Sequence, residues 1–94
     1  MKVVKTPMNK LLKYKFCGMI DATATGKLLY LMLSELSDEN GEIIIPQRKI
    51  CDALHISRSA VSRNLRRLRR AGAISIIPTY HSDGGRGANK FVVK

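Results

Sequence analysis

Arginine is concentrated in one short segment of this chain. Residues 58–71 contain six arginines and no acidic residue. A helix that only faces solvent usually mixes acidic with basic residues, because opposite charges one turn apart attract and like charges repel. The planar guanidinium group can bind a phosphate or a guanine edge bidentately. The segment therefore predicts a surface that binds a polyanion.

The spacing of the other residues in this segment predicts how it is oriented. Val61, Leu65 and Leu68 recur at helical spacing and indicate a narrow buried stripe. Ser57 is a suitable N-cap, and Gly72 a suitable residue to end the helix. The polar side chains then occupy the opposite arc. Base-edge contacts are expected from the first two turns, at Arg58, Ser59, Ser62 and Arg63, and the N-cap Ser57 belongs to the same DNA-binding surface. Phosphate contacts are expected from Arg66 and Arg67.

Two neighbouring segments could extend this surface. Gln47 and Arg48 open a preceding helix, where a phosphate contact and plain solvent exposure are equally good interpretations. A glycine-rich hairpin around residues 81–88 carries Arg86 at its expected tip, with Lys90 nearby. Such a tip can reach the neighbouring minor groove or the DNA backbone. The alternative is a flexible hairpin that makes no contact.

Other chemistries have little support in the sequence. Cys51 and His55 are four residues apart and could form half of a metal site, but only Cys17 and His81 remain to complete it. No catalytic triad, carboxylate pair or phosphate-binding loop is recognisable. We therefore expect no enzyme activity, no metal and no cofactor.

Composition and charge narrow the class of partner. The 94 residues carry a formal net charge of +10, and residues 53–94 hold nine basic residues against one acidic residue. DNA, RNA and anionic membrane all satisfy this charge. An aromatic content of 5% argues against stacking on single-stranded RNA, and the apolar run around residues 28–33 is too short to span a bilayer. These features favour double-stranded DNA, no membrane association and a cytoplasmic location.

The elements expected around the arginine segment form one small domain. Thr23, or alternatively Asp21, caps a helix over residues 24–36, and residues 42–45 form a short strand. Pro46 is expected in the first turn of a helix over residues 47–54, with Ala53 facing inward. Strands are expected at residues 73–80 and 89–93. The predicted fold is mainly α with a small β-hairpin (α+β), comprising a three-helix core in residues 23–94. Residues 1–22 form a basic arm with a short helical or extended piece that docks on the domain.

The stretch GEIIIPQRKICDALHISRSAVSRNLRRLRRAGAISI, residues 41–76, resembles the winged helix-turn-helix of bacterial DNA-binding proteins. Residues 23–94 are similar to domains of small transcription regulators, including those of mobile elements, and of plasmid and phage replication initiators. The resemblance implies that Ser57 caps a recognition helix, that the residues after it face bases, and that Arg86 lies at a wing tip. His55 stands where relatives often have glycine, and Arg69 and Arg70 where they often have acids.

Three functional hypotheses remain open at this point. The leading one is sequence-specific binding of double-stranded DNA by a transcriptional regulator. The alternative is the DNA-binding domain of a plasmid, phage or conjugative-element replication or transfer protein. An interaction module that uses the same fold to bind protein belongs to a different class. A monomer and a homodimer both fit the sequence, with residues 1–20 as the segment available for dimerisation.

Overall fold

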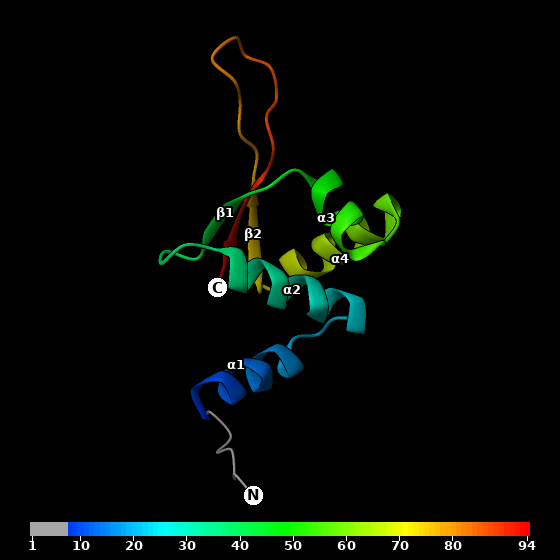
Figure 1. The fold of residues 1–94 in the computed structure, drawn as a ribbon, viewed down its shortest axis with the longest axis vertical. Helices are drawn as coiled ribbons and strands as arrows, with labels where there is room; N and C mark the ends of the chain where they lie inside the picture. Colours follow the sequence, from blue (N-terminus) through cyan, green and yellow to red (C-terminus); the bar gives the residue numbers. More distant parts are fainter. Residues whose placement is uncertain (1–7) are drawn as a thin grey trace, which may run out of the picture.

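The computed structural model describes residues 8–94, which form four helices and a three-stranded antiparallel sheet. The helices are α1 (Met8–Met19), α2 (Ala24–Leu36), α3 (Gln47–Leu54) and α4 (Arg58–Arg70). The strands are β1 (Glu42–Ile44), β2 (Ile74–Ile77) and β3 (Lys90–Val93). The α3–α4 pair and the sheet both lie over α2, and the β2–β3 connection projects as a long arm (Figure 1). The predicted winged helix-turn-helix, mainly α with a small β-hairpin, is confirmed.

The sheet places β3 between the other two strands. β1 pairs with β3 through Ile43 and Phe91, and β2 pairs with β3 through Ile76 and Phe91. Residues directly opposite each other share one face of a sheet, so these three side chains lie on the same side. Phe91 is completely buried, and both isoleucines pack against the core. The wing consists of β2, β3 and the arm between them. Strand β1, which precedes α3, thereby joins the wing to the rest of the domain.

The core is built where α2 crosses α4. Leu29 and Leu33 of α2 are completely buried, as are Val61 and Leu68 of α4, which confirms the predicted stripe. Gly26 lies at the closest approach, since a Cβ atom there would lie 3.3 Å from Asn64 Oδ1. The apolar stripe and this close packing fix the rotation of α4 about its own axis.

The helix ends follow the sequence prediction in most places. Thr23 accepts a hydrogen bond from the Gly26 amide, and Ser57 accepts one from the Ala60 amide. Gly72 has a positive φ of 77°, as expected of the residue that ends a helix. His55 ends α3 with φ 52°, the left-handed conformation that explains why glycine suits this position.

Three local predictions were wrong. Pro46 is the N-cap of α3 and not a first-turn residue, because its backbone is still extended. Ala53 is exposed, since α3 buries only one side of its two turns through Ile50. The second strand ends at Ile77 instead of residue 80, because Pro78 follows it and has no N–H to donate to a sheet.

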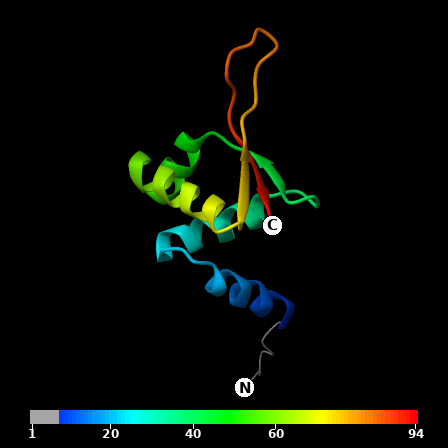
Figure 2. The same cartoon turned by 180° about the vertical axis from the view of Figure 1, so that it is seen from behind.

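The segment before the core contains a regular helix. The prediction left residues 1–20 as helical or extended, and α1 resolves this for Met8–Met19, while residues 1–7 of the predicted arm lie outside the described residues. Cys17 is 3% exposed against α2, and Lys27 Nζ donates to the Gly18 carbonyl at 3.0 Å. Figure 2 shows α1 beneath α2, at the opposite end of the molecule from the projecting arm. Within the described part of the chain, no helix has the length and hydropathy needed to cross a membrane.

Candidate nucleic-acid interface

The outward face of α4 is strongly basic. Because Val61 and Leu68 are buried, the opposite side of the helix must face solvent, and Ser59, Arg63 and Arg66 are all exposed there. Arg66 Nε donates to the Ser62 carbonyl at 3.4 Å, which is a local contact that leaves most of the guanidinium donors available. These three of the side chains predicted to contact DNA are therefore accessible, whereas Ser62 is half-buried.

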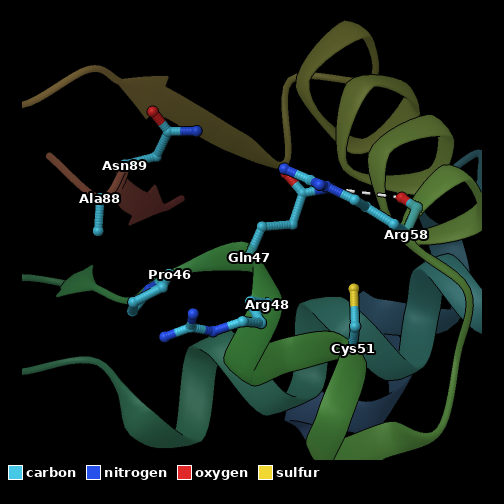
Figure 3. Close-up of a pocket in the computed structure, with 7 residues that line it drawn as sticks. All are labelled: Pro46, Gln47, Arg48, Cys51, Arg58, Ala88 and Asn89. Atoms are coloured by element: carbon cyan, nitrogen blue, oxygen red, sulfur yellow. Dashed lines mark hydrogen bonds between the residues drawn. The ribbon is translucent and has the colours of Figure 1, made fainter. Parts of the chain in front are cut away.

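The start of α3 lies against the first turns of α4. Gln47 Nε2 donates to the Ser62 hydroxyl and contacts the Arg58 carbonyl at 3.4 Å. A cavity of about 600 Å³ opens here, and Figure 3 shows Arg48, Cys51 and Arg58 around it. Gln47 thus has a structural role in addition to its predicted DNA contact, because it fixes the two helices relative to each other.

Arg86 directly follows the turn at the end of the arm, close to its predicted place at the tip. The turn at the end of the arm is formed by His81–Gly85, where the His81 amide donates to the Gly85 carbonyl, and Arg86 lies on the returning strand opposite Tyr80. The Arg86 guanidinium donates to Asn89 Oδ1 at 3.2 Å. A cavity of about 180 Å³ between α4 and the arm is lined by Arg86 together with Arg66 and Arg69. The Arg86 side chain therefore faces α4 from the arm.

Two other predicted residues have partners within the protein. Lys90 begins β3 and forms an ion pair of 2.8 Å with Glu42 on β1, so it is not gathered at the arm tip as expected. Arg67 forms an ion pair of 3.1 Å with Asp21, in the α1–α2 linker, and its Nε donates to the Asp21 carbonyl. Both pairs place a carboxylate beside a cation that the sequence prediction had assigned to DNA.

Arg69 is a residue that the sequence prediction did not assign. It lines the cavity beside the arm with Ser62, which lies two turns earlier on the same flank of α4. The spacing of seven residues between them is the signal that could have identified this flank. Arginines of α4 therefore lie on this flank as well as on the outward face.

The half metal site is not completed in the structure. Within residues 8–94, no three His, Cys, Asp or Glu side chains are grouped closely enough to hold a metal ion. Cys51 instead lines the cavity at the start of α3, and His55 is exposed at the turn between α3 and α4.

Comparison with known proteins places this architecture in a family. No curated protein matches the chain. A family model described as MarR family matches residues 30–81, more than half of the chain, from within α2 to the tip of the arm. Its members are DNA-binding winged-helix transcription regulators and not enzymes. This chain belongs to the MarR family.

Proposed function

We propose that this chain is a sequence-specific transcription regulator that reads the major groove of double-stranded DNA with the outward face of α4. The observation that carries the proposal is the division of this helix into a completely buried apolar stripe and an exposed arginine and serine face. The family match supports a regulator over a replication or transfer protein. A cytoplasmic location is part of the proposal, because the target is DNA.

The first turns of α4 are assigned to base reading. Ser59, Ser62 and Arg63 lie near the helix N-terminus, where small side chains let the backbone approach the base edges. Gln47 and Arg48 at the start of α3 would contact a phosphate beside the groove, as N-terminal amides of a helix also favour anions. Arg86 and Arg69 would grip the backbone between α4 and the arm.

The decisive experiment is selection of bound duplexes from a random pool, followed by affinity measurements on the selected site. Arg63→Ala should cost about 1–3 kcal/mol and relax the preference at one position of the site. Arg66→Ala should weaken all sequences similarly and reduce the salt slope by about 1. Equal losses on selected and scrambled duplexes for Arg63→Ala would contradict the base-reading role, and Arg86→Glu with unchanged affinity would contradict the role of Arg86.

We also propose that the chain forms a homodimer through α1. Leu12, Phe16 and Met19 recur at helical spacing and are 47%, 63% and 80% exposed. MarR-family proteins typically dimerise, and a second copy of this chain would cover this stripe. Sedimentation of the wild type should give a dimer and Phe16→Glu a monomer, while Tyr14→Glu, on another side of α1, serves as the control. A wild-type monomer at high concentration would contradict the proposal.

A further inference from the structure

A second arginine-lined cavity lies on the flank of α4 opposite Arg86. It has a volume of about 370 Å³ and is bounded by the start of α2. Its lining consists of two small polar residues and four arginines: Thr23, Asn64, Arg63, Arg66, Arg67 and Arg70. Thr23 and Asn64 are hydrogen-bonded to each other, so the wall that they form is rigid. We call this space the α2–α4 cleft.

The charge of the α2–α4 cleft is only partly compensated. Asp21 lines an adjoining cavity of about 260 Å³, which shares Arg67 and Arg70 with the cleft, and its carboxylate binds Arg67 at 3.1 Å. No other carboxylate within residues 8–94 forms an ion pair with an arginine of α4. The Asp21 side chain is 91% exposed, so its attraction for Arg67 is weakened by solvent. The cleft therefore has four guanidinium groups, and one exposed carboxylate is paired with one of them.

A phosphate group would supply the negative charge and the hydrogen-bond acceptors that these arginines lack. Guanidinium groups bind phosphate oxygens bidentately with charge-assisted hydrogen bonds, and several arginines can share one phosphate. The Arg67 donor that now binds Asp21 is one that a phosphate would use. Asp21 and Thr23 also precede residue 30, so they lie outside the part of the chain that matches the family.

We propose that the α2–α4 cleft binds a backbone phosphate of DNA through Arg67 and Arg70, and that Asp21 is an internal counter-ion which this phosphate displaces. The proposal rests on the proposed DNA-binding function and adds a further phosphate site to it. It assigns a phosphate contact to Arg70, which has no role in the proposed reading of bases. Asp21 weakens DNA binding in this scheme, because its contact with Arg67 must break before the phosphate binds.

The first test measures the affinity for a selected duplex by fluorescence anisotropy between about 50 and 200 mM salt. Arg70→Met should weaken binding and reduce the magnitude of the salt slope by about 0.9, the value expected for one lost phosphate contact. Asp21→Asn should tighten binding by about two- to fivefold, the equivalent of one exposed ion pair. Asp52→Asn on α3 is the matched control, since Asp52 is also exposed and forms no ion pair in the described chain.

The second test separates local competition from a general effect of charge. In an Arg67→Met background, Asp21→Asn should leave the affinity unchanged, because the arginine for which Asp21 competes is gone. An equal gain in both backgrounds, or a gain no larger than that of Asp52→Asn, would overturn the role of Asp21. An unchanged salt slope for Arg70→Met would overturn the phosphate site. If the wild type binds no duplex at all, the proposed DNA-binding function itself fails.

Discussion

The two basic helices, α1 and α4, carry their charge in different settings. On α4, Leu68 is completely buried and the arginines occupy the opposite side. On α1, the lysines are interspersed with apolar residues such as Phe16, 63% exposed, and the buried anchor of the helix is Cys17. Packing that fixes the rotation of a helix directs its charged side chains to one side. This difference supports the proposal that α4 reads DNA, whereas α1 has an uncovered apolar side.

The largest effect should come from removing the stripe that fixes α4. Leu68→Ala should lower the free energy of unfolding by about 2–5 kcal/mol, because it leaves a cavity in the core. Leu11→Ala on α1 is the matched control and should change the free energy by about 0.5 kcal/mol or less, since Leu11 is 41% exposed. Urea denaturation measures both. Similar losses for the two variants would show that α1 is as firmly packed as α4.

A smaller effect is expected from the polar contacts that hold each helix on α2. Thr23 caps α2 and binds Asn64 of α4, so Thr23→Ala should cost roughly 0.5–2 kcal/mol. Lys27→Met removes the corresponding contact of α1, the exposed hydrogen bond to the Gly18 carbonyl, and should change stability by less than about 0.5 kcal/mol. Thermal unfolding of both variants tests this order, and a greater loss for Lys27→Met would reverse it.

Periodicity and end signals were sufficient to predict most of the fold. The stripe through Val61 and Leu68, the caps at Thr23 and Ser57, and Gly72 each depend on residues close together in the sequence. The pairing of β1 with β3 joins Ile43 to Phe91, and nothing in either local sequence specifies that partner. Residues 8–19 could not be assigned because the buried side chain of α1 is Cys17, while Phe16 and Met19 are exposed, so the apolar residues do not mark the packed side of the helix.

The site was predictable to the extent that it lies on one helix. The spacing of Ser59, Arg63 and Arg66 places them on the solvent side of α4, as the structure does. The partners of Arg67 and Arg86 could not be predicted in the same way. Asp21 lies 46 residues from Arg67 in the sequence, and the fold of the arm determines that Arg86 turns toward Asn89. Such contacts depend on tertiary structure, which helical spacing does not report.

The reactivity of the two cysteines can show how firmly α1 packs on α2, and the experiment needs no substitution. Burial raises the pKa of the Cys17 thiol, an effect that the nearby Lys27 ammonium partly offsets. A raised pKa leaves less reactive thiolate at neutral pH, and the packing of α1 on α2 also restricts access to the sulfur. Cys51 is only half-buried and lines the cavity beside Arg58. Iodoacetamide should therefore modify Cys51 before Cys17 at pH 7, and the rate at Cys17 should keep rising with pH until its raised pKa is passed.

Mass spectrometry of the modified peptides measures both rates in one sample. Bound duplex should slow the modification of Cys51, because its cavity lies beside the proposed groove-reading residues, and leave Cys17 unchanged. Equal rates for the two cysteines in the free protein would mean that α1 separates from α2 on the time scale of the reaction. The side of α1 that packs on α2 would then also be exposed for part of the time. The two helices would differ in how firmly they are packed as well as in their charge. Protection of Cys17 by DNA would instead place α1 at the interface and remove the distinction between the two helices.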